Sequence, residues 1–507
     1  MRTLHSAKNL FFSILATILS ILLGFITRKI FIDNIGIEYL GLNGLLYNIL
    51  GAVALLESGF GISITYNLYK PLAENNEEEV TALTQLYHRI YKWIAFAILC
   101  ISLLLVPFLD IFIHDAEKPD FLIPIFLIFV INTLIPYFTA HKRALIGADQ
   151  KGYKLARIDI SYQIASSIAK ILILYYTQNY ILFLLIETIL LLTTNTIISY
   201  RVNTLYPYIN TKEKYSVDEN TKRSIKTIVK ASFISGIGGY FMYSSSNILM
   251  STYISLAVVG LYSNYKLIID SVSGIVSQFI NCSGASIGNL IASQDREYVY
   301  KVFRSVMLLN FIVAMTAGSS LMHLLNPFIE WWIGAEYCFS TLTVFLLISF
   351  FLLNALRMSI FTFKTKSGIY HPDRYTALLQ GIINVVAALV LVHFYDLNGI
   401  LLALNISVLA IGFWQTPRLV YKLTFQKPLY LYFIDYAAFL GIGILAHLLS
   451  TYIFSFSETE LTLGYMMYMG IISVIIVLIT YVLVLYKSES LRFLLSHINI
   501  LKPNRTN

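Results

Sequence analysis

Residues 10–26 read LFFSILATILSILLGFI, an apolar segment without a charged side chain. An α-helix rises 1.5 Å per residue, so a segment of this length approaches the roughly 30 Å hydrocarbon core of a membrane. Arg2 and Lys8 precede the segment, but it is longer than the apolar core of a signal peptide and no A-x-A-like cleavage site follows it. We therefore expect a first transmembrane helix that the mature protein keeps.

The composition of the whole chain agrees with this segment. Of 507 residues, 57% are hydrophobic and only 13% are charged, about half the charged share of a typical soluble domain. A soluble protein of this length needs more surface charge, so a helical membrane protein is predicted. The low charge content excludes soluble enzymes and nucleic-acid binders. The net charge of +8 does not indicate nucleic-acid binding, because Lys and Arg collect in the cytoplasmic loops of membrane proteins. Cys100, Cys282 and Cys338 lack metal-ligand spacing, so no metal site is predicted.

Apolar runs separated by polar breaks predict fourteen transmembrane helices. The predicted ranges are 9–31, 40–69, 86–109, 121–140, 156–177, 180–200, 226–251, 257–284, 300–325, 340–363, 374–394, 398–421, 429–452 and 463–486. With the N-terminus in the cytoplasm, most Lys and Arg residues fall in alternate loops, whereas the other loops are short and mostly acidic or neutral. Positive charge collects on the cytoplasmic side of membrane proteins, so both termini are expected to be cytoplasmic.

An internal repeat relates the two halves of the chain. An offset of 219 residues places Ile254–Leu261 over Ile35–Leu42, and polar or small residues recur at matching positions nearby. An even number of helices separates the copies, so both cross in the same direction. We predict an all-α membrane protein with two parallel six-helix lobes, related by a pseudo-twofold axis along the membrane normal, plus two C-terminal helices. The predicted divisions are 1–205 (N-terminal lobe), 206–225 (cytoplasmic linker), 226–424 (C-terminal lobe) and 425–507 (last two helices and cytoplasmic tail).

Charged side chains within the predicted helices are candidates for function, because a charge in the bilayer is costly without water, a partner or a substrate. Four cations are predicted to form the wall of a central water-filled cavity: Arg28, Lys170, Lys266 and Arg357. Such a wall favours an anionic substrate, since Lys and Arg bind phosphate oxygens. Polar side chains on the helical stripes are predicted to line the same cavity: Ser20, Tyr47, Tyr243, Ser273, Ser277 and Asn281.

Structural explanations compete with this interpretation. Stripes of small and polar residues also let helices pack closely. Lys266 and Asp270 are one helical turn apart and would neutralise each other as a structural pair. Arg28 lies near a helix end, from which its head group would reach the membrane surface. Glu57 or Asp270 is the candidate site for coupling to a proton or a sodium ion, and no other cofactor is expected.

The helix plan and four short segments resemble the Wzx-like polysaccharide flippases of the multidrug/oligosaccharidyl-lipid/polysaccharide exporter superfamily. The segments are RKIF (28–31), GIEYLGL (36–42), LYKPLA (68–73) and GADQKGY (147–153). The resemblance covers essentially the whole chain and implies alternating access of two lobes about a cationic cavity in a bacterial cytoplasmic membrane. The implied cargo is an undecaprenyl-diphosphate-linked oligosaccharide, such as an O-antigen precursor of lipopolysaccharide, moved to the outer leaflet. The implied partners are a polysaccharide polymerase and export proteins.

Three other functions stay open at this point. A multidrug exporter of the same superfamily would use acids such as Glu57 and Glu187, although the intramembrane cations argue against it. A lipid II flippase would share both the helix plan and a diphosphate-bearing cargo. A membrane polysaccharide polymerase or ligase is disfavoured, because such enzymes present a large outer loop and the predicted outer loops are short. We therefore expect a transporter and not an enzyme.

Overall fold

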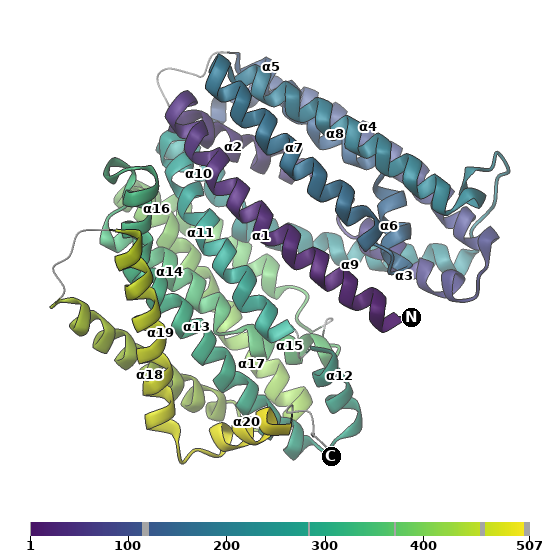
Figure 1. Ribbon diagram of the computed structural model, residues 1–507. Coiled ribbons are helices and arrows are strands. Elements are labelled where there is room, and N and C mark those ends of the chain that lie inside the picture. Colours follow the sequence, from purple (N-terminus) through teal and green to yellow (C-terminus); the bar gives the residue numbers. More distant parts are fainter. Residues whose placement is uncertain (1, 114–120, 282–283, 370–371, 457–461, 501–507) are drawn as a thin grey trace, which may run out of the picture. The chain divides into compact units, whose positions relative to one another are not determined.

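A computed structural model describes residues 2–113, 121–281, 284–369, 372–456 and 462–500 (Figure 1). Every regular element in these ranges is a helix. Nine helical segments of the described residues are long and apolar enough to cross a membrane. A tenth is obtained when Leu122–Phe138 and Ala140–Ala148, which are bent by 43°, count as one span. The predicted all-α membrane fold is therefore confirmed, whereas the count of fourteen spans stays a prediction.

The helices pack into two compact units, of which unit 1 covers Met1–Gly260. Its helices are α1 (Arg2–Ile35), α2 (Ile37–Ala54), α3 (Phe60–Ala73), α4 (Glu77–Leu105), α5 (Leu122–Leu134), α6 (Ala140–Ala148), α7 (Tyr153–Thr177), α8 (Tyr180–Leu205), α9 (Glu219–Tyr243) and α10 (Ser245–Tyr253). Helix α7 packs along both α1 and α8, and the short helices α3 and α6 contact each other. Figure 1 shows α4, α7 and α8 as long, nearly parallel rods within this unit.

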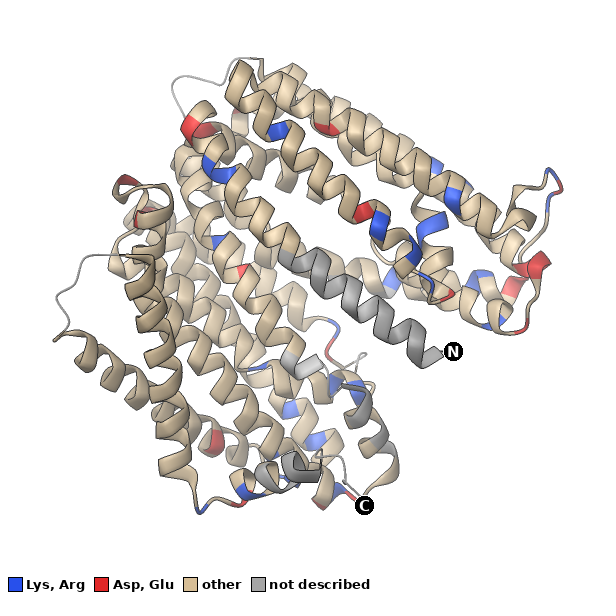
Figure 2. Cartoon of the chain, in the orientation of Figure 1, with Lys and Arg blue, Asp and Glu red and all other residues tan. Residues whose placement is uncertain are grey.

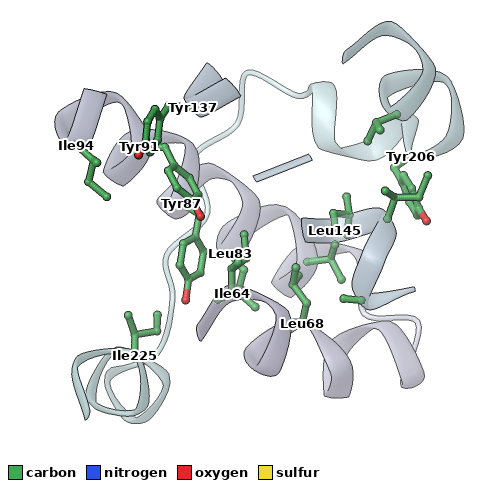
Figure 3. Close-up of a cluster of buried hydrophobic side chains, with 14 of the residues drawn as sticks. Ile64, Leu68, Leu83, Tyr87, Tyr91, Ile94, Tyr137, Leu145, Tyr206 and Ile225 are labelled. Carbon is green, nitrogen blue, oxygen red and sulfur yellow. The ribbon is translucent and has the colours of Figure 1, made fainter. Parts of the chain in front are cut away.

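A buried cluster around α3, α4, α6 and α8 forms the core of unit 1 (Figure 3). Ile64 and Leu68 of α3 and Leu83 and Tyr87 of α4 belong to it and are fully buried. The hydroxyl of Tyr87 donates a hydrogen bond to Ser63 Oγ at 3.0 Å, so the polar end of the ring also has a partner. Lipid tails are as apolar as this core, so close packing and internal hydrogen bonds hold the helices together.

Unit 2 covers Leu261–Asn507 and is built around a long central helix, α13. Its helices are α11 (Leu256–Asn281, which begins in unit 1), α12 (Gly284–Ser293), α13 (Arg296–Ile333), α14 (Thr341–Ala355), α15 (Met358–Lys366), α16 (Thr376–Ser407), α17 (Phe413–Val420), α18 (Tyr430–Phe454), α19 (Leu463–Leu485) and α20 (Glu489–Ile500). Helix α13 contacts α14, α15, α18, α19 and α20. Two π-helical stretches, Val408–Gly412 and Tyr421–Phe425, flank α17.

The predicted span 340–363 is interrupted between α14 and α15. A break inside a membrane leaves backbone carbonyls without helical partners, and these need other donors. The side-chain amide of Asn310, on α13, donates hydrogen bonds of 3.0 Å to the carbonyls of both Ala355 and Leu356. A long-range contact from α13 therefore stabilises this break.

The crossing of α2 with the start of α11 follows the predicted repeat. A Cβ atom on Gly41 would overlap the carbonyl oxygen of Leu256, and a Cβ atom on Gly260 would overlap that of Ile37. The 219-residue offset superposes Gly41 on Gly260 and Ile37 on Leu256, so the contact, which lies within unit 1, is reciprocal.

Two helices that the sequence assigns to the C-terminal lobe pack within unit 1. Helix α9 contacts α3, and α10 contacts α2. The predicted lobe boundaries themselves stay a prediction.

Candidate functional site

Helix α1 carries two consecutive cations. Lys29 Nζ lies 3.9 Å from Asp33 Oδ2 on the same helix, and about half of each side chain is exposed. Arg28 is half-buried and leaves the helix about 100° away from Lys29. Ser20, two turns earlier, is exposed. Figure 2 shows how few charges lie along the middle of the long helices. The role of Arg28 as a cavity cation stays a prediction.

A mostly buried ion pair joins α7 to α8. Lys170 Nζ lies 2.9 Å from Glu187 Oε2, and only 16% and 20% of the two side chains are exposed. The ammonium group also lies 5.0 Å from the centre of the Phe183 ring. In apolar surroundings, burying an ion pair costs far less free energy than burying a single charge. The sequence predicts Lys170 as a cavity cation, and in the structure Glu187 offsets its charge.

Aromatic and polar side chains surround this pair. Tyr47 of α2 is 58% exposed, and its ring packs edge-on against Phe129 with centroids 5.1 Å apart. Glu187 is within electrostatic range of both Tyr47 and Tyr162. Helices α2, α7 and α8 therefore share one polar region of unit 1. Tyr243, at the end of α9, is 48% exposed.

Glu57 lies where the second predicted span is broken. Helix α2 ends at Ala54, a 3₁₀ turn follows, and α3 begins after Gly59, whose φ of 89° favours glycine. The Tyr91 hydroxyl donates a long hydrogen bond of 3.5 Å to Glu57 Oε1. A shallow, open pocket of about 300 Å³ adjoins the break, lined by Gly51, Ala54, Leu55, Glu57, Ser58, Gly59, Gly61 and Ile62. A carboxylate in such a pocket at a broken membrane helix can hold a proton or a small cation.

Lys266 and Asp270 form an ion pair on α11. Lys266 Nζ lies 2.7 Å from Asp270 Oδ2, with 41% and 57% of the two side chains exposed. Two turns further, Ser277 Oγ donates to the carbonyl of Ser273 at 2.7 Å and lies 3.7 Å from Met358 Sδ. The side chain of Asn281 lies outside the described residues. The structure therefore shows the intrahelical pair that the spacing of Lys266 and Asp270 indicates.

Arg357 lies at the break between α14 and α15. Its two terminal guanidinium nitrogens lie 2.6 and 2.9 Å from the point where a Cβ atom on Gly412 would be, and Gln380 Nε2 reaches the same point. Gly412 ends a π-helical stretch, and its missing side chain makes room for the guanidinium group. Gln380 is only 5% exposed, and Tyr432 and Tyr436 of α18 are within electrostatic range of Arg357. Arg357 therefore meets a polar cluster inside unit 2.

A protein-family model described as "Polysaccharide biosynthesis protein" matches residues 6–286. This range is more than half of the chain. The chain belongs to the polysaccharide biosynthesis protein family. The match confirms the family resemblance stated from the sequence, and no curated protein matches the chain.

Solved structures of several transporters share the fold of this chain. It is similar to a lipid II flippase, MurJ, in an inward closed conformation, with 15% identity and a TM-score of 0.67 over 94% of this chain and 99% of that one. An inward-facing multidrug resistance MATE family transporter has 13% identity and a TM-score of 0.58 over 79% of this chain and 94% of that one. A MOP superfamily transporter from Pyrococcus furiosus has 13% identity and a TM-score of 0.54 over 80% and 94%.

The sequence indicates which charges lie within the predicted spans, but not all the residues that pair with them. Gln178 and Asn179 form the turn between α7 and α8; Lys170 lies eight residues before it and Glu187 eight residues after it. Residues equally far from the turn of an antiparallel helix pair lie at the same depth, so this symmetry could have revealed the pair. Gln380, which meets Arg357, comes from a separate helix and has no such local signal.

Proposed function

We propose that this protein is a flippase that moves an undecaprenyl-diphosphate-linked oligosaccharide from the cytoplasmic to the outer leaflet of a bacterial cytoplasmic membrane. The family match over residues 6–286 carries this proposal, because it connects the chain to polysaccharide biosynthesis. The fold supports it, since the chain shares its helix arrangement with a lipid II flippase over 94% of its length. In this proposal the protein moves its substrate and does not transform it.

The proposed substrate site uses the intramembrane cations. Arg28 and Arg357 are the preferred ligands of the diphosphate, because a planar guanidinium group donates two parallel hydrogen bonds to phosphate oxygens. Lys170 and Lys266 already hold carboxylates at 2.9 and 2.7 Å, so for these two residues substrate phosphate competes with an existing partner. Polar side chains are proposed to line the path of the head group: Ser20, Tyr47, Tyr243, Ser273, Ser277 and Asn281.

The proposed mechanism is alternating access. The predicted lobes, residues 1–205 and 226–424, would open the cavity to one side of the membrane at a time. Both termini are placed in the cytoplasm, following the distribution of Lys and Arg among the loops. A polysaccharide polymerase and export proteins would then receive the translocated cargo.

Glu57 is the preferred site for ion coupling. It lies at a broken helix, accepts a hydrogen bond from Tyr91 and lines an open pocket of about 300 Å³. Freed backbone groups at a broken membrane helix commonly serve coupling ions. Asp270 is the second choice, because Lys266 already neutralises it at 2.7 Å.

A lipid II flippase is the second candidate function, and the coverage of 94% of this chain by MurJ favours it specifically. A multidrug exporter is less supported, because Lys170 neutralises Glu187, one of the acids that such an exporter would use.

Deletion of the gene, followed by extraction of lipid-linked oligosaccharides, tests the proposed function. We expect a lipid-diphosphate-linked oligosaccharide to accumulate on the cytoplasmic face and surface polysaccharide to disappear, with both restored by the wild-type gene on a plasmid. Accumulation of lipid II instead would assign the second candidate. Unchanged polysaccharide with no accumulating lipid-linked intermediate would contradict both.

A further inference from the structure

Helix α6 brings four basic side chains together between α4 and α8, both of which it contacts. The rings of His141 on α6 and His88 on α4 have centroids 4.6 Å apart. On the other side, Lys142 Nζ donates to Ser199 Oγ of α8 at 2.6 Å. Lys92 lies one turn after His88 on α4, within electrostatic range of both imidazoles. We call His88, Lys92, His141 and Lys142, with Ser199, the α4–α6–α8 basic site.

Among the residues that the structure describes, no carboxylate forms an ion pair with Lys92 or Lys142, the two charged groups of this basic site. The nearby Asp159 pairs with Arg143 instead, at 2.9 Å. His141 is 3% exposed, and its Nδ1 atom has no hydrogen-bond partner in the described part of the chain. The two ammonium groups repel each other, so an anion bound between them is stabilised.

Exposed aromatic side chains beside the basic site indicate a position at the membrane interface. Trp93 directly follows Lys92 and is 69% exposed, and Tyr200 directly follows Ser199 and is 74% exposed. Exposed Trp and Tyr side chains are typical of the boundary between hydrocarbon and water. Phosphate groups of lipids lie at this depth, and basic pockets between membrane helices bind such head groups. Lys92 is exposed and Lys142 half-buried, so both are accessible to a lipid.

We propose that the α4–α6–α8 basic site binds the phosphate of an anionic phospholipid in the inner leaflet. Lys92 and Lys142 are the ligands, His88 borders the site between them as a neutral ring, and the hydrogen bond from Lys142 to Ser199 holds that ammonium group in place. Free inorganic phosphate has the same chemistry, but the exposed aromatic rim favours a lipid. The site does not involve Arg28 or Glu57, so it stands or falls independently of the proposed transport function.

Quenching of Trp93 fluorescence by brominated lipids tests this site. The chain has four tryptophans, and replacing the other three (Trp331→Phe, Trp332→Phe and Trp414→Phe) makes Trp93 the reporter. In bilayers that mix phosphatidylglycerol and phosphatidylcholine, with one of the two brominated, we expect phosphatidylglycerol to be preferred at Trp93. Each lysine contributes about fivefold to this preference, so Lys92→Gln with Lys142→Gln should reduce it to nearly one.

Matched variants and a competing anion distinguish binding of a lipid from binding of free phosphate and from a general effect of positive charge. Lys142→Arg keeps the charge and should keep the preference, and Arg157→Gln removes an exposed cation elsewhere on unit 1 and should also keep it. Excess inorganic phosphate at constant ionic strength should leave the preference intact; if phosphate abolishes it, the site takes free phosphate and the assignment to a lipid is wrong. Equal quenching by both lipids in the parent protein, or an unchanged preference in the double variant, would overturn the proposal.

If the variant without the other tryptophans fails to fold, native mass spectrometry of the wild-type protein gives the same comparison. Retained phosphatidylglycerol should then decrease when Lys92 and Lys142 are both replaced by Gln, and undiminished retention would overturn the proposal.

Discussion

At the scale of single residues, the intramembrane charges differ in what holds them. Lys170 is neutralised across two helices by Glu187, with most of both side chains buried. Lys266 is neutralised within one helix by Asp270, and both of these side chains are substantially exposed. Arg357 instead fills the space left by Gly412. The position of a cation inside a membrane helix therefore does not identify it as a substrate ligand. The partner that already neutralises the cation determines which variants can test its role.

The pair of Lys170 and Glu187 gives a prediction at this scale. Lys170→Leu leaves Glu187 as a buried charge without its partner, which should cost roughly 3–5 kcal/mol, whereas Lys170→Leu with Glu187→Leu should recover most of that loss. Thermal unfolding of the purified variants in detergent measures both. Lys222→Leu is the control, because Glu219, the partner of Lys222, is largely exposed. Loss of this exposed ion pair should lower the stability by less than about 1 kcal/mol.

If the double variant is as unstable as the single one, the pair is not what stabilises this region. If the double variant is stable but exports no polysaccharide, the pair of Lys170 and Glu187 acts in transport as well as in stability.

Local spacing explains which parts of the candidate site were predictable. Lys266 and Asp270 are one turn apart, and this spacing alone indicates the pair that the structure shows. The surroundings of Arg357 are not predictable in this way, because Gln380 and Gly412 come from other helices and meet it only after folding. Likewise His88 and His141 lie 53 positions apart in the sequence and become neighbours only through the packing of α6 against α4.

At the scale of elements, the apolar periodicity predicts where helices lie but not where they break. The span predicted at 40–69 divides at Gly59, where the sequence does hold a local signal in Ser58-Gly59. The span predicted at 340–363 divides at Arg357 with no Gly or Pro nearby, because Asn310 of α13 satisfies the freed carbonyls. When a distant residue stabilises a break, the sequence of the broken segment itself need not contain a helix-breaking residue.

The crossing of α2 with α11 gives a prediction at this scale. Gly41→Ala and Gly260→Ala each place a Cβ atom onto a backbone carbonyl oxygen, which cannot move as a flexible side chain would. We expect each variant to lose about 3 kcal/mol or more of stability, seen as a lower unfolding temperature and lower yield. Gly24→Ala and Gly274→Ala meet no atom within 4 Å and should behave as the wild type. A strong effect at only one of the two crossing positions would argue against a reciprocal contact.

At the scale of the whole molecule, the low charge content and the apolar runs are sufficient to predict an all-helical membrane protein. The fold shared with MurJ and MATE transporters agrees with that prediction. The 219-residue offset also has a physical counterpart, because Ile37, Gly41, Leu256 and Gly260 make a reciprocal contact. Composition and periodicity do not encode the cargo, since a diphosphate linked to different sugars presents the same charge to the membrane helices.

The most direct test of the central claim is transport in proteoliposomes that contain the purified protein and a fluorescent undecaprenyl-diphosphate-linked oligosaccharide. A membrane-impermeant quencher reaches only the outer leaflet, about half of the label, unless the lipid is flipped. With a proton or sodium gradient imposed, we predict that the wild-type protein makes nearly all of the label accessible, and that Arg28→Gln and Arg357→Gln slow this about 10- to 100-fold. Label that stays half protected in wild-type proteoliposomes, as in protein-free ones, would contradict the account.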